Sequence, residues 1–415
     1  MKIAFINQPW NSCPPIEFGS IAIWTYEVAR NLSKMCDITV YAKSSKMQKR
    51  VEFIDGIQFR RISTYFDGLL QNYLQRFLKI GNIKNRLFAT NFFYLCYIVK
   101  IAYDLKKQNC DIVHIHNFSQ FVPVIKAFNP KVKIVLHMHC EWLTQLDRSL
   151  IEKRINHVDL IIGCSKYITE KICKRFPLLS NRCYTIYNGV NTDHFVNNDT
   201  KLKKKNDSQR LLFVGRITPE KGIHILLKAF EIVVKHYPKA HLEIVGPYAP
   251  TAREFIIDLK NDNNLSHLEF FYKGSYLTHL HSMVEPDLKN HISFSNSVPQ
   301  YKLKDYYCNA DILVNPSFSE SFGMSLIEAM ACQVPVVATH VGGMTEIVNN
   351  KAGILVEPGN IHALADAIMK LMSNEDLRIS MGQAARNAVE NFFSWNRIAE
   401  NLLFQYERII KNNDE

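Results

Sequence analysis

The sequence lacks the cysteine and histidine spacings of a zinc site, and it lacks any long hydrophobic run. Its ten cysteines are scattered, and none of them forms a CxxC pair. Scattered thiols in a chain of this size favour a reducing compartment over a disulfide framework. No apolar stretch reaches the roughly 18 residues that span a bilayer. The apolar run from Lys2 to Ile6 meets Asn7 and Pro9 too soon for a signal sequence. These absences predict a cytoplasmic protein.

Common recognition patterns for nucleic acids and nucleotides are also missing. The net charge is +11, but no helix-turn-helix, zinc-finger or RNP-like pattern accompanies it, so no nucleic-acid partner is expected. Neither a Walker motif nor a GxGxxG glycine pattern occurs. The 415 residues are 47% hydrophobic and 21% charged, which is a composition that supports two ordinary globular domains.

Most of the positive charge lies in one segment, from Lys43 to Lys107. Thirteen lysines and arginines there accompany four acidic residues, which leaves a local excess of nine positive charges. Bulky apolar residues such as Tyr65, Phe66 and Tyr73 are interleaved with these bases. Such a composition suits an anionic membrane surface or an anionic acceptor. The alternative is a pair of core helices with solvated basic faces.

Strand-like and helix-like segments alternate along most of the chain, which predicts parallel sheets with crossover helices. A polar, lysine-rich stretch at residues 197–209 is typical of a linker. We therefore expect an α/β fold of two doubly wound domains, residues 1–196 and 210–394, with ligands between them at the carboxyl ends of strands. The tail has the pattern of an amphipathic helix. Within the long connection 248–300, the part from Tyr272 to Lys289 is interpreted as a surface insertion with some helix.

Two carboxylates stand eight positions apart across a predicted strand-to-helix turn. Ile312 to Val314 are predicted as a buried strand and Met324 to Ala331 as a helix, so Glu320 falls in the turn and Glu328 in the helix. A helical rise of about 1.5 Å per residue would put them roughly 12 Å apart. That separation suits one elongated polar ligand held at both ends, and it exceeds the approximately 5 to 9.5 Å of a glycosidase pair. Gly323 lets a ligand approach the backbone, and the helix start offers free amides to an anion.

Two further positions are candidates for binding phosphate groups. The run from Leu211 to Gly222 is predicted as a strand, a loop and a helix start, with Arg216 and Lys221 at the carboxyl end of the strand. Two cations there could hold a diphosphate and stabilise it as it leaves. The alternative is a pair of surface bases. Gly19 opens a predicted helix after the first strand, in the position of a βα phosphate loop.

Four histidines occur in two strand-like runs, at positions 114, 116, 137 and 139. Residues two apart in a strand share a face, so a zinc site has to be considered. No nearby acidic residue completes a set of ligands, and buried histidines with hydrogen-bond partners are commoner. We therefore expect no metal. His116 and His139 come at the ends of their strands, where the predicted cleft begins.

An ordered series of motifs resembles the retaining nucleotide-sugar glycosyltransferases of family 4. The resemblance runs from Met1 to about Tyr406, and its most specific part is the E-x7-E signature from Glu320 to Glu328. The other parts are Asn188 to Phe195, Gly215-Arg216 with Glu220 to Gly222, Ala310 to Ile312, Pro316-Ser317, Pro335 to Ala338 and Gly342-Gly343. The family has the GT-B architecture: two Rossmann-like domains face a deep cleft, and a C-terminal helix, here 395–415, crosses back to the first domain.

The resemblance assigns a role to each candidate residue. Arg216 and Lys221 would bind the donor diphosphate. Glu328 would bind the ribose hydroxyls, and Glu320 the hydroxyls of the transferred sugar. His139 would lie near the sugar and the acceptor. Backbone groups of four further residues would complete the donor site, at Gly19, Val298, Gly323 and Met324.

The resemblance also implies a reaction. A hexose-type sugar would pass, with retention, from a UDP- or GDP-linked donor to an acceptor in glycan, glycolipid or polysaccharide biosynthesis. No cofactor and no metal would be required, because two cations and helix amides stabilise the leaving diphosphate. Independently of the resemblance, the positive charge of segment 43–107 predicts peripheral attachment to the inner face of the membrane. Transfer to a small soluble metabolite, a nucleotide-sugar 2-epimerase of the same architecture and a catalytically silent scaffold are the alternatives.

Overall fold

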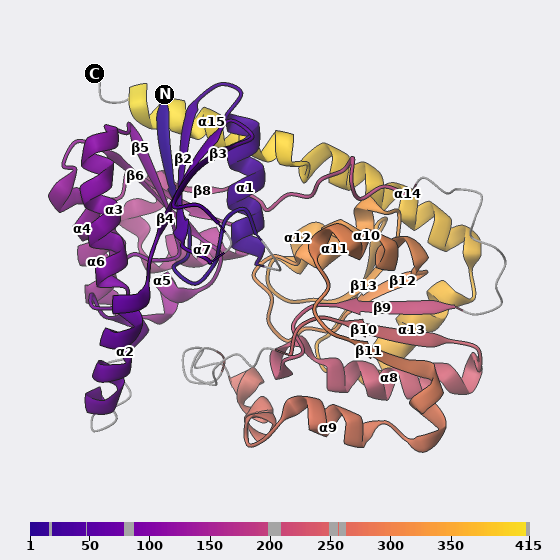
Figure 1. The fold of residues 1–415 in the computed structure, drawn as a ribbon. Helices are drawn as coiled ribbons and strands as arrows, with labels where there is room; N and C mark the ends of the chain where they lie inside the picture. Colours follow the sequence, from indigo (N-terminus) through magenta and orange to yellow (C-terminus); the bar gives the residue numbers. More distant parts are fainter. Residues whose placement is uncertain are drawn as a thin grey trace. The chain divides into compact units, whose positions relative to one another are not determined.

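The computed structural model describes residues 1–15, 19–46, 48–78, 87–197, 209–248, 256 and 263–411. The chain divides into two compact units, Met1–Tyr187 with Trp395–Glu415, and Asn188–Ser394 (Figure 1). Each unit is a largely parallel sheet with helices on both faces. The predicted α/β fold with two doubly wound, Rossmann-like domains is therefore confirmed.

The first unit holds an eight-stranded sheet in the order β3-β4-β2-β1-β5-β6-β7-β8, parallel except for the β3–β4 pair. Its strands are β1 (Lys2–Ile6), β2 (Asp37–Lys43), β3 (Val51–Ile54), β4 (Ile57–Ile62), β5 (Ile112–His116), β6 (Lys133–Met138), β7 (Leu160–Gly163) and β8 (Cys183–Thr185). β5 is buried along its whole length, as expected of a parallel strand covered on both faces.

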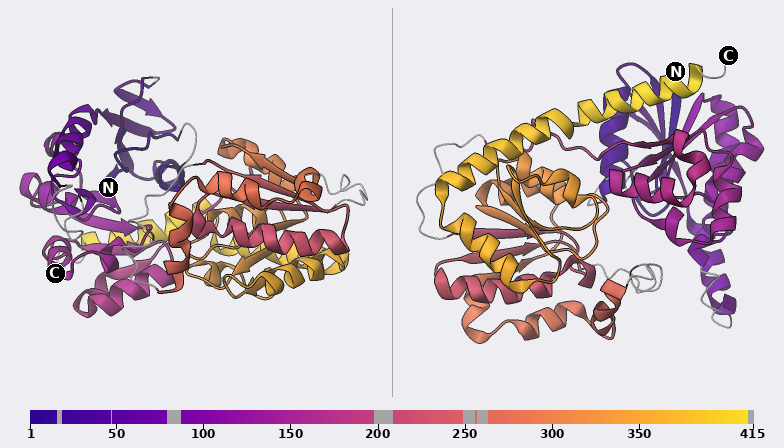
Figure 2. Two further views of the ribbon diagram at one scale, coloured as in Figure 1. Left: turned by 90° about the horizontal axis from the view of Figure 1, so that it is seen from below. Right: turned by 180° about the vertical axis from the view of Figure 1, so that it is seen from behind.

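Helices cover both faces of this first sheet. The helices of this unit are α1 (Ser20–Leu32), α2 (Tyr65–Leu78), α3 (Leu95–Gln108), α4 (Phe121–Phe128), α5 (Trp142–Gln145), α6 (Arg148–Ile155), α7 (Lys166–Arg175) and α15 (Trp395–Lys411), with the short 3-10 helices η1 (Leu87–Ala89) and η2 (Pro177–Arg182). α15 packs against α1 on one face, and α3 and α4 pack together on the other (Figures 1 and 2). Ile398, Leu402, Tyr406 and Ile409 form the buried stripe of α15.

The second unit is built on a six-stranded, all-parallel sheet in the order β11-β10-β9-β12-β13-β14. Its strands are β9 (Arg210–Val214), β10 (His241–Val245), β11 (Ile292–Ser295), β12 (Ile312–Asn315), β13 (Val336–Thr339) and β14 (Gly353–Val356). Its helices are α8 (Ile223–His236), α9 (Tyr276–Met283), α10 (Gln300–Asn309), α11 (Met324–Ala331), α12 (Met344–Ile347), α13 (Ile361–Met372) and α14 (Glu375–Phe392), with 3-10 helices η3 (Pro219–Lys221), η5 (Asn263–Tyr272) and η6 (Pro286–His291).

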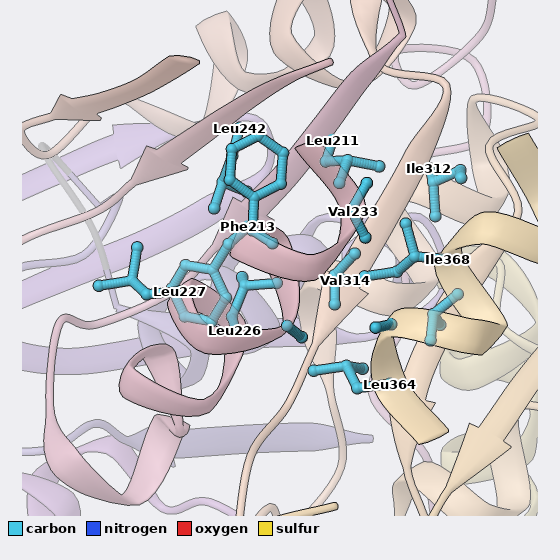
Figure 3. Close-up of a cluster of buried hydrophobic side chains, with 14 of the residues drawn as sticks. Leu211, Phe213, Leu226, Leu227, Val233, Leu242, Ile312, Val314, Leu364 and Ile368 are labelled. Carbon is cyan, nitrogen blue, oxygen red and sulfur yellow. The ribbon is translucent and has the colours of Figure 1, made fainter. Parts of the chain in front are cut away.

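The core of the second unit lies between this sheet and the paired helices α8 and α13. Phe213 and Val314 come from the strands, and Leu226 and Ile368 come from the helices (Figure 3). All four side chains are almost fully buried. This packing holds the carboxyl ends of β9 and β12 side by side, so the loops that follow them have a rigid base.

Strand order reverses once in each sheet, between β1 and β5 in the first unit and between β9 and β12 in the second. Ligands of doubly wound folds bind beyond the carboxyl ends of strands at this reversal. In the second unit, the loop after β9 carries Arg216 and Lys221, and the loop after β12 carries Glu320. In the first unit, Gly19 follows β1 and His116 ends β5.

The division between the units falls at Tyr187, before the predicted boundary at residue 196. The chain from Asn188 onward is bonded to the second unit: the Val190 amide donates to the Phe393 carbonyl at 2.7 Å, and Arg386 donates to the carbonyls of Phe195 and Thr192 at 2.7 and 3.0 Å. Most of the predicted linker 197–209 lies outside the described residues.

The segment Tyr272 to Lys289, predicted as a surface insertion with some helix, contains helix α9 and is largely exposed, but it also packs on the core. Tyr276 and Leu280 of α9 are buried in the core of the second unit, and the Tyr276 hydroxyl lies 2.8 Å from His224 Nδ1 on α8. The segment then leads into β11, which extends the sheet. Among the described helices, none combines the length and the apolar composition needed to cross a membrane.

Candidate active site

Two loops of the second unit are joined where β9 and β12 end. Gly222 has a φ of +68°, and a Cβ atom there would lie 2.1 Å from the Pro316 carbonyl oxygen. The Phe318 amide donates to the Glu220 carbonyl at 2.8 Å. Only glycine fits this close backbone approach in this conformation, so residue 222 lets the two loops meet and brings the neighbouring Lys221 to Glu320.

Lys221 and Glu320 form an ion pair at the centre of the site. Lys221 Nζ donates to Glu320 Oε2 at 2.5 Å, and the side chains are 13% and 19% exposed. Burial by itself raises the pKa of Glu320, but the Lys221 ammonium and its hydrogen bond outweigh burial and hold that pKa below its usual value. Glu320 is therefore an ionised acceptor at neutral pH.

The Glu320 loop is also fixed from the side of β13. The Gly343 amide donates to the Glu320 carbonyl at 3.2 Å, and a Cβ at Gly343 would lie 2.4 Å from the Ser321 carbonyl oxygen. Gly323 and Met324 follow directly as the start of α11, so the first amides of this helix lie in the same loop as the carboxylate. The loop combines an anionic side chain with backbone donors suited to an anionic ligand.

Arg216 is tethered by a buried carboxylate. Its Nη2 lies 3.5 Å from Glu220 Oε1, and the Tyr272 hydroxyl donates to Glu220 Oε2 at 3.3 Å. The Glu220 side chain is only 2% exposed, whereas that of Arg216 is 47% exposed. The buried Glu220 carboxylate therefore orients the Arg216 guanidinium, which remains accessible to an anion.

Glu328 is held by two partners that the sequence did not reveal. Gln300 Nε2 donates to Oε1 at 2.8 Å, and the Tyr307 hydroxyl donates to Oε2 at 2.7 Å. Burial raises the pKa of Glu328, and the two hydrogen bonds partly offset that rise. Burial and the nearby Glu328 charge raise the pKa of Tyr307 well above its usual value, so this hydroxyl remains a donor. Val298 is half-buried just before α10.

The two predicted site residues of the first unit lie in the connections that follow two different strands, β1 and β6. Gly19, with a φ of +132°, directly precedes α1. His139 directly follows β6 and is half-buried. Its amide donates to Asn117 Oδ1 at 2.7 Å, and its Nε2 lies 3.0 Å from His116 Nδ1.

The histidine cluster behind His139 is a hydrogen-bonded network. One nitrogen each of His114, His116 and His137 lie within 4.8 Å of one another. His114 Nδ1 lies 2.6 Å from the Tyr406 hydroxyl, and His114 Nε2 lies 3.2 Å from His137 Nδ1. Both nitrogens of His116 are also bonded, to Thr25 and to His139. Among the described residues, His137 Nε2 alone of these six nitrogens has no partner. That no metal binds here stays a prediction.

Comparison with known proteins gives matches to both units. The family model "Glycosyltransferase Family 4" matches residues 21–194, and the model "Glycosyl transferases group 1" matches residues 196–388. Spore coat protein SA of Bacillus subtilis is 26% identical over 424 residues, which cover 98% of this chain and 100% of that protein. The capsular polysaccharide biosynthesis glycosyltransferase CapM of Staphylococcus aureus is 32% identical over 264 residues, 61% of this chain and 63% of CapM.

Solved structures share the fold over the whole chain. Sucrose-phosphate synthase from Thermosynechococcus elongatus has a TM-score of 0.74 at 21% identity, with 99% of each chain covered. The Anabaena protein HepE in complex with UDP and glucose has a TM-score of 0.70 at 18% identity, with 98% of this chain and 99% of HepE covered. The two family models together span almost all of both units, so the chain belongs to the glycosyltransferases of family 4 and has the GT-B fold.

Proposed function

We propose that this glycosyltransferase moves a hexose-type sugar from a nucleotide-diphosphate sugar to an acceptor in glycan, glycolipid or polysaccharide biosynthesis, with retention of anomeric configuration. The observation that carries the proposal is the Lys221–Glu320 pair, beside the accessible Arg216, at the strand reversal of the second unit. Relatives support it: HepE has been solved with UDP-glucose, and CapM is named for capsular polysaccharide biosynthesis.

The charges of the site match the bond that breaks. As the bond between the anomeric carbon and the diphosphate oxygen lengthens, negative charge gathers on the diphosphate. Arg216, Lys221 and the amides at Gly323 and Met324 stabilise that charge. The acceptor oxygen bonds to the anomeric carbon from the same face, and its proton passes to the departing diphosphate. Glu320 binds the sugar hydroxyls in this scheme and forms no covalent intermediate.

Glu328 suits the ribose end of the donor. Each of its oxygens accepts one hydrogen bond from the protein, and a carboxylate oxygen has two lone pairs. Two acceptor positions therefore remain for two ribose hydroxyls. Val298, just before α10, would meet the base through its backbone, and Gly19 and His139 of the first unit would approach the diphosphate and the sugar.

A donor panel tests the function. UDP-, GDP-, ADP- and dTDP-sugars are offered singly, and nucleotide release is measured with and without glycan, lipid-linked and small-metabolite acceptors. We expect release from one or two donors, UDP- or GDP-linked, to depend on an acceptor, with an α product from an α donor. Nucleotide release that yields no acceptor-dependent product would indicate a 2-epimerase instead.

Removal of divalent ions is expected to leave transfer essentially unchanged. The leaving diphosphate already meets two side-chain cations and a helix start, which supply the charge stabilisation that a metal ion would otherwise provide. The measurement is the initial rate before and after dialysis against EDTA. Complete loss of the rate, restored by Mg²⁺ or Mn²⁺, would contradict a metal-independent mechanism.

We further propose that helices α2 and α3 attach the enzyme to an anionic membrane surface. Tyr65, Phe66, Leu69 and Tyr73 form a stripe along α2 and are each more than half exposed. On α3, the Lys100 ammonium lies 5.3 Å from the centre of the Phe66 ring, so a base lies beside the apolar stripe. α3 buries its own apolar face, as a core helix would, whereas these four residues of α2 are exposed. Exposed aromatic residues beside lysines suit a lipid headgroup region.

Sedimentation with vesicles tests this surface. The protein is expected to pellet with phosphatidylserine-containing vesicles at low salt and to be released as salt rises, because salt screens exposed charges. Replacing Tyr65, Phe66 and Leu69 together with serine should abolish pelleting. Phe404→Ser, on the 64% exposed Phe404 of α15, is the matched control and should pellet normally. Failure of the unaltered protein to pellet at low salt would remove the proposal.

A further inference from the structure

The ring of His139 belongs to a chain of hydrogen bonds that begins in helix α1. Thr25 Oγ1 donates to the Ile21 carbonyl at 2.7 Å and also lies 3.0 Å from His116 Nε2. A threonine hydroxyl has one hydrogen to donate, and the Ile21 carbonyl can only accept. Thr25 therefore accepts from His116, and the proton of His116 is on Nε2.

The proton on His116 determines the proton on His139. His116 is fully buried, and burial lowers its pKa well below the usual value, with the neighbouring His114 and His139 adding to the effect. The ring is therefore neutral, and Nδ1 is its acceptor. Since His116 Nδ1 lies 3.0 Å from His139 Nε2, that nitrogen of His139 has to be the donor.

The opposite direction of the hydrogen bond between His116 and His139 would break another hydrogen bond. If His116 carried its proton on Nδ1, its bare Nε2 would need the Thr25 hydroxyl as a donor, and the 2.7 Å bond from Thr25 to Ile21 would be lost. The second branch of the network, from Tyr406 through His114 to His137, uses other nitrogen atoms. The rings of the two branches pack against each other, with the His137 and His139 centroids 4.1 Å apart.

The residue after His116 fixes the backbone of His139. Asn117 Oδ1 accepts from the His139 amide at 2.7 Å, and the Asn117 amide donates to the His137 carbonyl at 2.8 Å. Asn117 has a φ of +61°, a left-handed conformation that asparagine tolerates better than most residues. Two consecutive residues at the end of β5 therefore hold the ring and the amide of His139.

We propose that Thr25, His116 and Asn117 are positioning residues for His139, and that they fix its proton on Nε2. With Nε2 bonded to His116, any contact of the ring with the transferred sugar is made through Nδ1. The part of this inference that concerns transfer rests on the proposed function. The position of the proton does not.

Two readouts on the intact enzyme test the inference. Long-range ¹H–¹⁵N spectra of histidine-labelled protein identify the protonated nitrogen, and His139 and His116 should both show the Nε2–H form. Thr25→Val should give a mixture of forms at His139, and Thr25→Ser should restore the single form. Thr39→Val, at a buried threonine bonded to Gln58 outside the network, is the matched control. His139→Asn assigns the signal.

Kinetics with the donor found by the panel give the second readout. Thr25→Val should lower kcat/KM about tenfold, a modest part of the roughly hundredfold loss that misplacement can cause, and Thr25→Ser and Thr39→Val should stay near the unaltered enzyme. An Nδ1–H form of His116 or His139 in the unaltered protein, or unchanged kinetics in Thr25→Val, overturns the proposal. Failure of the proposed function is distinct from either result, because it would appear as no transfer by the unaltered enzyme while its spectra show Nε2–H.

Discussion

Replacing Lys221 with alanine is expected to lower kcat by about two to three orders of magnitude, the loss typical when one group that stabilises developing charge is removed. Lys221 has two tasks in the proposed site. Its ammonium neutralises the departing diphosphate, and its 2.5 Å bond to Glu320 keeps that carboxylate ionised and oriented toward the sugar. Its loss therefore affects both ends of the breaking bond, and Glu320→Ala should reduce turnover to a similar extent.

Folding has to be separated from chemistry in these variants. Without Lys221 the largely buried Glu320 loses its partner, which costs about 1 to 3 kcal/mol of stability. Glu320→Gln keeps the shape and removes the charge, so it should lose turnover with a smaller loss of stability. Lys235→Ala is the matched control, because Lys235 and Glu231 form a 3.1 Å pair in the same unit but are 69% and 43% exposed. Normal turnover by folded Lys221→Ala would refute the assignment.

The sequence was sufficient to locate the elements that carry the site. The strand predicted at Ile312 to Val314 is confirmed by β12, and the helix predicted at Met324 to Ala331 is confirmed by α11. In a doubly wound sheet, the position of a strand end determines where the next loop lies, so Arg216, Lys221 and Glu320 could be expected at one edge from periodicity alone. Gly222 and Gly343 also belong to motifs that the sequence analysis quoted. Their close contacts with neighbouring backbone are seen only in the structure.

The partners of the site residues could not be predicted, because they come from distant elements. Tyr307 and Gln300 reach Glu328 from α10, and Thr25 reaches His116 across 91 positions. No local spacing encodes such pairs. Buried polar side chains are expected to form hydrogen bonds, but sequence periodicity does not identify the residues that they bond to. For the segment that holds α2, the sequence left a membrane surface and a core helix as alternatives, because an apolar helical stripe ordinarily predicts burial. The exposure of the stripe is seen only in the structure.

Acid is expected to unfold the first unit steeply, with a loss of about 4 kcal/mol of stability per pH unit between pH 6 and pH 5. His114, His116 and His137 are fully buried, and burial, with contributions from neighbouring histidine charges, lowers the pKa of each well below its usual value. In the unfolded chain they titrate near pH 6.5. Their stabilisation is therefore present above pH 6.5 and lost as pH falls, by about 1.4 kcal/mol per unit for each proton taken up on unfolding.

Tryptophan fluorescence isolates this transition, because all four tryptophans, Trp10, Trp24, Trp142 and Trp395, belong to the first unit. Urea unfolding followed at 350 nm and repeated at several pH values gives the slope. Burial also raises the pKa of Glu27 and of Asp67, and protons that these acids take up in the folded state at lower pH reduce the slope.

Two variants make the slope attributable to particular residues. His137→Gln removes one titrating group and should reduce the slope by about 1.4 kcal/mol per pH unit. His224→Gln lies in the second unit, where burial lowers the pKa of His224 to about 3, and it should leave the fluorescence slope unchanged while altering the transition seen by far-ultraviolet circular dichroism. A slope of one proton or less in the unaltered protein would mean that the histidines titrate in the folded state. In that case His116 would be charged, and the direction of the hydrogen bond to His139 would no longer follow from its burial.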